Sequence, residues 1–206
     1  MTPLPESLLE AVASAAVREG LADAIFTRLS TPIGRLLVVQ GPRGIVRVGF
    51  EEEREDAVLA EVAGRLGPRL VASDRELAGT RETLSAYLEG GDDRLDLPVD
   101  LELVQAPFRR QVLETLHRSV GRGEVVTYGA LAERSGRPKA FRAAASACAR
   151  NPIPIVVPCH RVLPGSGGIG NYGGGVERKR VLLSLEGREF RLPGERAPSA
   201  TLRDVD

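Results

Sequence analysis

Two adjacent residues in the last third of the chain pair a nucleophile with a base. Cys159 and His160 stand in the segment NPIPIVVPCHRV, residues 151–162. Its prolines bracket an apolar run and predict an extended, stiff backbone as far as Cys159. The thiolate is the reactive form of cysteine, so a nucleophilic Cys159 needs a base nearby. Because neighbouring side chains of an extended strand point apart, His160 would act through a curved backbone or a bridging water. A buried structural cysteine is the alternative.

Cysteine and histidine are scarce in the rest of the sequence. The 206 residues hold only two of each, with Cys148 and His117 as the second pair. Such a chain has no disulfide framework, and without a CxxC spacing we expect no zinc site and no other metal or cofactor. Cys148 is expected to be a small buried residue, and His117 is given no catalytic role.

Charge is distributed unevenly along a chain whose formal net charge is zero. Residues 1–100 hold 11 Lys and Arg against 18 Asp and Glu, whereas residues 101–190 hold 14 against 7. The basic second half would attract polyanions such as nucleic acid. A chance distribution of surface charge is the alternative. We therefore predict an N-terminal domain over residues 1–100, a second domain over 101–190 and a loosely held tail over 191–206.

The first half has the pattern of a small α/β domain. A short amphipathic helix is expected within residues 1–20. Three strands follow at 25–29, 36–40 and 45–50, separated by turn formers, and predict an antiparallel meander. Helices are expected at 51–66 and 74–89. Residues 95–101 alternate apolar and polar, but Pro98 favours an edge strand or a linker.

The second half is predicted to be mainly helical. Apolar residues recur at helical spacing over 108–120. Thr127 has the character of an N-cap for a helix over 128–134, which Gly136 closes. Pro138 suits the first turn of another helix that runs to about Arg150. This pair of helices is a helix-turn-helix candidate, and a last helix is expected over 176–185 after an irregular stretch.

The second helix of that pair has two different faces. Phe141, Ala144, Ala145 and Cys148 form an apolar face that should pack inward. The other face combines basic residues with very small ones, which suits close approach to a phosphate backbone or a shallow groove. With Thr127 at the preceding N-cap, the predicted DNA-contacting residues are Thr127, Lys139, Arg142, Ala143 and Ser146. An alanine-rich core helix with solvated basic ends is the alternative.

Composition places the chain among ordinary globular proteins. Hydrophobic residues make up 42% and charged residues 27%. No apolar run reaches the ~18 residues that span a bilayer. The first residues lack a basic start and carry Glu6 and Glu10, so they do not resemble a signal peptide. We therefore expect a cytoplasmic protein without a membrane partner.

The string PCHRV, with NPIPIVV before it and GIGNYGGGVERKRVLL after it, resembles the signature of the O6-alkylguanine-DNA alkyltransferases. The resemblance covers about residues 107–187. It implies a small RNase-H-like N-terminal domain and a winged-helix-like DNA-binding domain. It further implies a single irreversible transfer of the alkyl group from O6 of guanine in duplex DNA to the protein. The base would be flipped out through the minor groove, and transfer from O4-alkylthymine is left open.

The resemblance also implies roles for individual residues. Cys159 is similar to the alkyl acceptor and His160 to the base that deprotonates it. Glu186 resembles the carboxylate that orients this histidine, and Asn151 resembles a residue that braces the network. Tyr128 matches the tyrosine that donates to guanine N3. Arg142 matches the arginine that fills the stack, and the implied guanine pocket is lined by Pro158, Val162, Tyr172 and Gly173.

Two positions depart from the family pattern. Phe141 is bulky where a small residue is common, and its predicted inward face indicates repacking. Gly173 stands where some members have serine, so no side chain is available there to bond the guanine O6. A slightly roomier pocket is the hypothesis that follows.

Three other functions fit parts of the pattern. An alkylated-DNA sensor would lack the acceptor cysteine, which Cys159 argues against. A helix-turn-helix regulator of the adaptive-response type would carry a cysteine-rich metal-binding N-terminus, which is absent. A cysteine hydrolase would turn over many substrates. The sequence favours a monomer and does not decide whether molecules cluster cooperatively on DNA.

Overall fold

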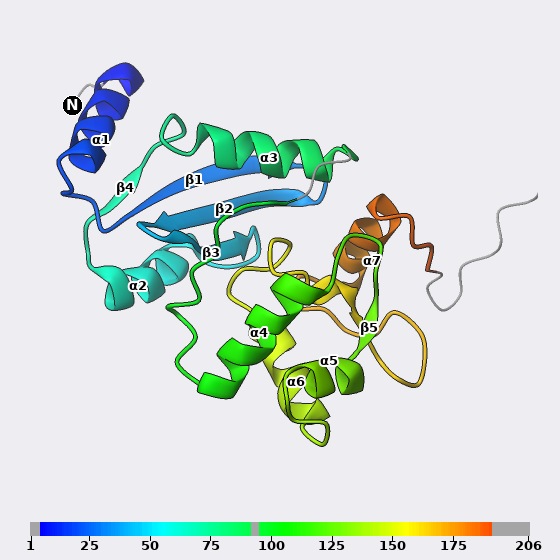
Figure 1. Ribbon diagram of the computed structural model, residues 1–206. Coiled ribbons are helices and arrows are strands. Elements are labelled where there is room, and N and C mark those ends of the chain that lie inside the picture. The colour runs from blue at the N-terminus through cyan, green and yellow to red at the C-terminus, as the bar shows by residue number, and fades with distance from the viewer. Residues whose placement is uncertain (1–4, 92–94, 191–206) are drawn as a thin grey trace, which may run out of the picture.

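The computed structural model describes residues 5–91 and 95–190 (Figure 1). Its N-terminal half has the elements α1 (Glu6–Arg18), β1 (Ala24–Thr31), β2 (Gly34–Gly41), β3 (Gly44–Phe50), α2 (Glu55–Leu66), β4 (Leu70–Ala72) and α3 (Ala78–Leu88). The strands form one sheet in the order β3-β2-β1-β4. The three-strand meander is antiparallel as predicted, but the sheet is mixed, because β4 adds a parallel edge strand beside β1.

Both faces of this sheet are buried, as the period-2 alternation of β2 shows. Leu36 and Val38 belong to a hydrophobic cluster that includes α3 and the helical half. Leu37 and Val39 belong to a second cluster, together with Val58 and Val62 of α2. In Figure 1, α3 and α2 accordingly lie on opposite faces of the sheet. The larger cluster continues without interruption into the second half of the chain.

Helix α1 is attached at the β4 end of the sheet. The Glu10 carboxylate accepts from Ser73 Oγ at 2.6 Å and from the Asp74 N–H at 2.9 Å. No helix of the described ranges 5–91 and 95–190 has the length and apolarity needed to cross a bilayer.

The second half consists of α4 (Pro107–Ser119), β5 (Val126–Thr127), α5 (Tyr128–Arg134), α6 (Phe141–Ala149), the 3-10 helix η1 (Cys159–Arg161), β6 (Val162–Leu163) and α7 (Val176–Leu185). Thr127 caps α5 as predicted, because its Oγ1 accepts from the Ala130 N–H at 3.1 Å. The extended segment before α4 pairs with the outer edge of β3 through Ile45 and Val99. The predicted tail over 191–206 lies outside the described residues.

Several details differ from the sequence prediction. Helices α2 and α3 begin four residues later than predicted, at Glu55 and Ala78. The strand β4 was not expected, since it has three residues and pairs with a strand far away in sequence. Helix α6 begins at Phe141, because Pro138 lies in a turn closed by the Ala140 N–H and the Arg137 carbonyl. Phe141 does not pack inward but is 48% exposed, because as the first residue of α6 it lies beyond the turns packed on α4 and α5.

Candidate active site

Cys159 begins the short helix η1, where the polypeptide turns between two buried segments. Its Sγ accepts a hydrogen bond from the Asn151 side-chain amide at 3.1 Å. The same amide donates to the Val157 carbonyl at 2.8 Å, and Asn151 Oδ1 accepts from the Ile153 N–H at 3.0 Å. Asn151 therefore ties both ends of the loop that presents the thiol.

The loop before Cys159 is folded into turns, so the predicted extended backbone is wrong. The Val157 N–H donates to the Ile153 carbonyl at 2.9 Å, and Ile155 takes a φ of 75°. Positive φ strains a β-branched residue, and burial of the whole side chain holds Ile155 there. The prolines restrict φ but do not prevent these turns. Both residues are buried, His160 completely and Cys159 with 6% of its surface exposed.

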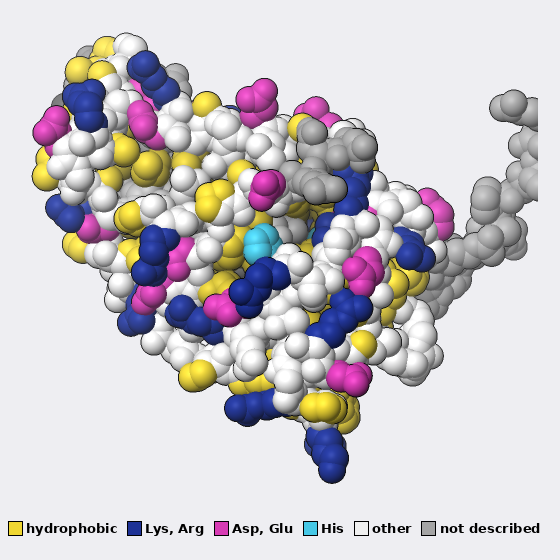
Figure 2. Space-filling model, in the orientation of Figure 1, with side chains coloured by type: hydrophobic (Ala, Val, Ile, Leu, Met, Phe, Trp, Pro, Cys, Tyr) yellow, Lys and Arg dark blue, Asp and Glu magenta, His cyan; other side chains and the backbone are white. Residues whose placement is uncertain are grey.

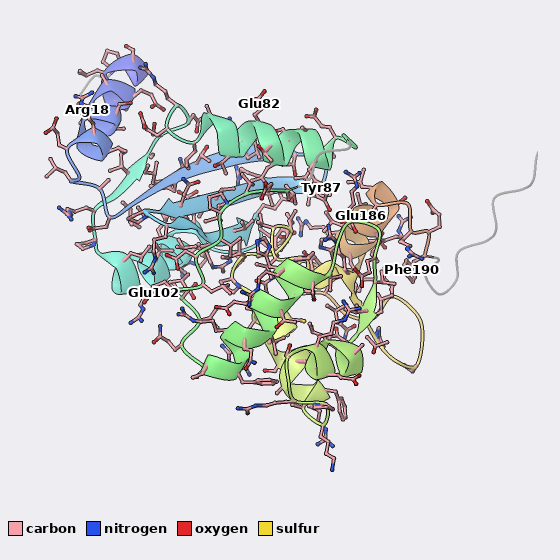
Figure 3. The ribbon with its side chains drawn as sticks, viewed as in Figure 1. Arg18, Glu82, Tyr87, Glu102, Glu186 and Phe190 are labelled. Atoms are coloured by element: carbon pink, nitrogen blue, oxygen red, sulfur yellow. The ribbon has the colours of Figure 1, made fainter. Side chains whose placement is uncertain are left out.

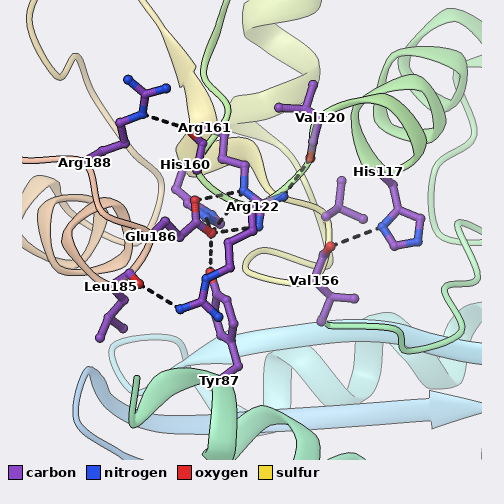
Figure 4. Close-up of polar contacts among 12 residues, drawn as sticks. Tyr87, His117, Val120, Arg122, Val156, His160, Arg161, Leu185, Glu186 and Arg188 are labelled. Atoms are coloured by element: carbon purple, nitrogen blue, oxygen red, sulfur yellow. Dashed lines mark hydrogen bonds and ion pairs between the residues drawn. The ribbon is translucent and has the colours of Figure 1, made fainter. Parts of the chain in front are cut away.

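His160 is held by a buried carboxylate (Figure 4). Its Nε2 lies 3.0 Å from Glu186 Oε1, so Nε2 carries the proton and Nδ1 keeps its lone pair. Nδ1 is buried and has no hydrogen-bond partner among the described residues. Arg161 binds the same carboxylate through Nε at 3.0 Å and Nη2 at 2.7 Å. Tyr87 donates its hydroxyl to Glu186 Oε1.

The buried charges set the protonation states of this group. Although burial opposes it, hydrogen bonds from His160 and Arg161 keep the pKa of Glu186 well below its ordinary value. Burial lowers the pKa of His160, against the effect of Glu186, so the imidazole rests neutral and is able to take up a proton. Burial also raises the pKa of the Cys159 thiol, while the Asn151 hydrogen bond and the Lys179 ammonium lower it. A resting thiol beside a neutral imidazole follows.

A cavity of about 380 Å³ opens beside the thiol. Four of its lining residues are ones that the resemblance assigned to the site, namely Cys159, Asn151, Tyr172 and Gly173. Pro158 and Val162 are buried and do not line it. The Tyr172 hydroxyl is buried without a hydrogen-bond partner in the described part of the chain. Burial, followed by Cys159, raises the pKa of this hydroxyl, so it lies close to the thiol.

The N-terminal half supplies the opposite wall of this cavity. Arg47, Phe50, Glu53 and Glu61 line it. The Phe50 ring meets Tyr172 edge-on, with centroids 6.2 Å apart and planes at 71°. The Val48 N–H donates to the Pro152 carbonyl at 2.9 Å, which fixes the sheet against the loop of the thiol.

Comparisons with known proteins find matches over both halves. Residues 24–101 match the ribonuclease-like domain of 6-O-methylguanine DNA methyltransferase, and residues 107–188 match its DNA-binding domain. The human methylated-DNA–protein-cysteine methyltransferase is 38% identical over 82% of this chain and 83% of its own length. The chain belongs to this family.

Other relatives agree with this membership. The Shigella flexneri methylated-DNA–protein-cysteine methyltransferase is 39% identical over 78% of this chain and 94% of its own. The Escherichia coli Ada protein, a bifunctional transcriptional activator and DNA repair enzyme, is 38% identical over 83% of this chain, which spans only 46% of Ada. The Mycobacterium tuberculosis O6-methylguanine methyltransferase structure has 31% identity and a TM-score of 0.67, covering 79% of this chain and 92% of its own.

The remaining predicted residues lie on the helix-turn-helix side of the family's DNA-binding domain. Tyr128 is half-buried at the start of α5, and burial, followed by the nearby Cys148 and Cys159, raises the pKa of its hydroxyl. Lys139, Arg142 and Ala143 are exposed around the start of α6, and Ser146 is partly buried. In Figure 2, Lys and Arg side chains gather with hydrophobic ones at the lower end of the molecule, where Figure 1 places α5 and α6.

Four residues near the thiol were not found from the sequence. Arg161 follows the Cys-His pair directly, and its place in PCHRV was a signal. Lys179 is fully buried and donates to the Val162 carbonyl at 2.8 Å, although its position in a charged helix indicated solvent. Tyr87 and Phe50 come from distant strands and helices, so no local pattern marked them. Within the described ranges, no group of three or more His, Cys, Asp and Glu side chains could hold a metal ion.

Proposed function

We propose that this protein repairs alkylated DNA by accepting the alkyl group of O6-alkylguanine on Cys159. The observation that carries the proposal is the joint arrangement of thiol, cavity and base. Cys159 lines a cavity of about 380 Å³, and the adjacent His160 has a free, buried Nδ1 and a carboxylate on Nε2. Membership of the methyltransferase family supports the same activity.

The reaction is a displacement at the first carbon of the alkyl group. The thiol proton passes to His160 Nδ1, by way of a bridging water, and Glu186 stabilises the imidazolium. The S–C bond forms as the C–O6 bond breaks, and guanine leaves with the electron pair. Tyr128 donates at N3, where the negative charge of the leaving group spreads. The guanine anion takes up the proton that His160 removed from the thiol, so the products are guanine and an S-alkylcysteine. Because the thioether does not hydrolyse, each molecule acts once.

DNA is the proposed partner, and α6 is the proposed contact. One of the similar solved structures, that of the Mycobacterium tuberculosis protein in complex with DNA, is 32% identical with a TM-score of 0.66, over 79% of this chain and 92% of its own. Flipping the nucleotide out of the duplex costs a few kcal/mol. Arg142 would offset this cost by filling the gap left in the base stack. Thr127, Lys139, Ala143 and Ser146 would contact the adjacent backbone. The division at residue 100, a monomeric state and a cytoplasmic location stay predictions, and cooperative clustering on DNA stays an open alternative.

One labelling experiment tests the proposal. The full chain is incubated with duplex carrying radiolabelled O6-methylguanine, and the label on the protein is counted. We expect one equivalent on wild type, none on Cys159→Ala, and one on Cys148→Ala, the matched control. Binding without label would indicate a damage sensor or regulator, and continuous release of product would indicate a hydrolase. Either result overturns the proposal.

A further inference from the structure

Glu186 receives hydrogen bonds from both halves of the chain. His160 and Arg161 of η1 reach it from one side, while Tyr87 of α3 reaches it from the sheet domain, 99 residues away in sequence (Figures 3 and 4). The Glu186 side chain is fully buried. A buried carboxylate is stable only where donors compensate it, so each of these contacts contributes to holding its charge.

Tyr87 is itself held tightly. Its side chain is 1% exposed, and the Arg122 guanidinium lies 5.4 Å from the centre of its ring. Arg122 in turn donates to the Leu185 carbonyl at 2.8 Å, directly before Glu186. Burial, and then Glu186, raises the pKa of Tyr87 far above the ordinary value, so the hydroxyl stays protonated and acts as a donor. A packed ring with a fixed hydroxyl has little freedom to release the carboxylate.

The oxygen that Tyr87 binds decides what the contact does. Tyr87, His160 and the Arg161 Nη2 group, at 2.7 Å, all bind Oε1, whereas Oε2 accepts from Arg161 Nε at 3.0 Å. Arg161 alone forms a two-pronged pair with the carboxylate and would draw it toward the guanidinium. The Tyr87 hydroxyl adds a donor from the other domain at the oxygen that the imidazole and the guanidinium share, and so fixes Oε1 in place against His160.

We propose that Tyr87 is a positioning residue for alkyl transfer, whose hydroxyl fixes Glu186 against His160 Nε2 and so keeps Nδ1 available for the Cys159 proton. This inference rests on the proposed function. It assigns the N-terminal domain a part in the chemistry, because the deciding donor comes from α3. The charged and titratable groups around the pair are Arg161 of η1, Lys179 of α7 and Arg122, which covers the Tyr87 ring.

The first measurement uses the full-length Tyr87→Phe protein and the free base O6-benzylguanine. Removing the hydroxyl keeps the ring and its packing. We expect the transfer rate constant at saturating benzylguanine to fall about tenfold, the effect of removing one charge-assisted hydrogen bond from the carboxylate that orients His160. The half-saturating concentration should not change, since Tyr87 does not line the cavity. Leu84→Val, a change in the same buried face of α3, is the matched control and should lower the melting temperature without changing the rate.

The second measurement does not depend on activity. The chain has two histidines, so ¹⁵N-histidine spectra give His160 with His117 as an internal reference. We expect Tyr87→Phe to shift the His160 ring nitrogens and leave those of His117 unchanged. In a Glu186→Gln background, Tyr87→Phe should cause no further loss of rate, because its effect passes through that carboxylate.

The outcomes separate the two proposals. A wild-type rate and an unshifted His160 signal in Tyr87→Phe would overturn the positioning role. So would a double variant whose rate falls by the product of the losses of Tyr87→Phe and Glu186→Gln measured separately. Wild-type protein that takes up no alkyl group would overturn the proposed function alone, since the spectra would still report whether Tyr87 fixes the pair.

Discussion

Lys179 is a buried cation whose amino group interacts electrostatically with the Cys159 thiol. It is fully buried, and burial lowers its pKa from 10.5 to about 8, with Cys159 and Cys148 acting in the opposite direction. The unfolded chain therefore binds more protons than the folded one between about pH 8 and pH 10.5. The contribution of Lys179 to the free energy of unfolding must therefore increase as the pH rises through that window.

The Lys179→Met variant tests whether the Lys179 contribution increases with pH. We expect methionine to stabilise the protein relative to wild type near pH 7, by up to roughly 3 kcal/mol, because it removes the cost of burying a charge. This advantage should shrink as pH rises through the window. Urea unfolding of both proteins at pH 7 and at pH 10 measures it. A difference in stability that stays constant across the two pH values would contradict the assignment.

Gly173 determines the size of the cavity next to the thiol. A Cβ at this position would lie 3.7 Å from the Ala149 carbonyl oxygen, an ordinary contact, so a side chain fits without strain. We expect Gly173→Ser to narrow the cavity and to lower the ratio of benzyl to methyl transfer about fivefold. Transfer rates with O6-benzylguanine and O6-methylguanine give the ratio. Equal ratios in both proteins would discard the roomier pocket.

Helix α6 has a buried side that packs on the domain and an exposed first turn. Ala144, Ala147 and Cys148 are buried against α4 and α5, while Phe141 and Arg142 are exposed at its first turn. The Arg142 guanidinium lies 5.5 Å from the Phe141 ring centre, so the bulky residue supports the arginine from its exposed side. A small residue here would leave Arg142 with more rotamers in the free protein.

Arg142→Ala should therefore weaken the interaction with DNA and leave the transfer reaction itself unchanged. We expect it to weaken duplex binding and to slow repair in DNA at least about tenfold, because the guanidinium no longer fills the stack. Reaction with free O6-benzylguanine should be nearly unchanged. Arg18→Ala, on the distant helix α1, is the control and should affect neither. An equal loss on both substrates would count against the stack-filling role.

The sequence predicted elements where a local pattern existed. The meander strands are short apolar runs between turn-forming residues, and the cap of α5 needs only Thr127 and the next turn. The strand β4 and the outward Phe141 depended on partners elsewhere in the fold. At the site, Cys159, His160, Asn151 and Glu186 came from recognisable motifs, and the structure brings these four together. Tyr87 depends on the docking of two halves, for which a single sequence gives no signal.

The two halves of the molecule share one site because they share one core. A single hydrophobic cluster includes β2, α3, α4 and α7, and Arg178 of α7 forms ion pairs with Glu51 at 3.0 Å and Glu52 at 2.8 Å. Arg178 also donates to the Ile33 carbonyl at 2.6 Å. The cavity wall made by Phe50 is thus fixed relative to the thiol, so on the proposed function the sheet domain would limit which alkyl groups fit.

At the cavity, Gly174 of the second half lies directly against the Phe50 ring of the first. A Cβ there would lie 2.5 Å from Cε2 and 2.6 Å from Cζ of Phe50, far inside contact distance. We expect Gly174→Ala to destabilise the protein by about 1–3 kcal/mol and to slow benzyl transfer more than methyl transfer, because the displaced ring enters the cavity. Thermal unfolding and the two transfer rates measure these effects.

Two companion variants make that prediction specific to the wall. Gly173→Ala adds the same methyl group one residue earlier, where there is room, and should leave the stability nearly unchanged. Combining Gly174→Ala with Phe50→Ala removes the ring that the new methyl group would strike, so the pair should cost less than the sum of the two single changes. Simple additivity would mean that Phe50 does not rest on Gly174 in solution, and that the sheet domain does not form this side of the cavity.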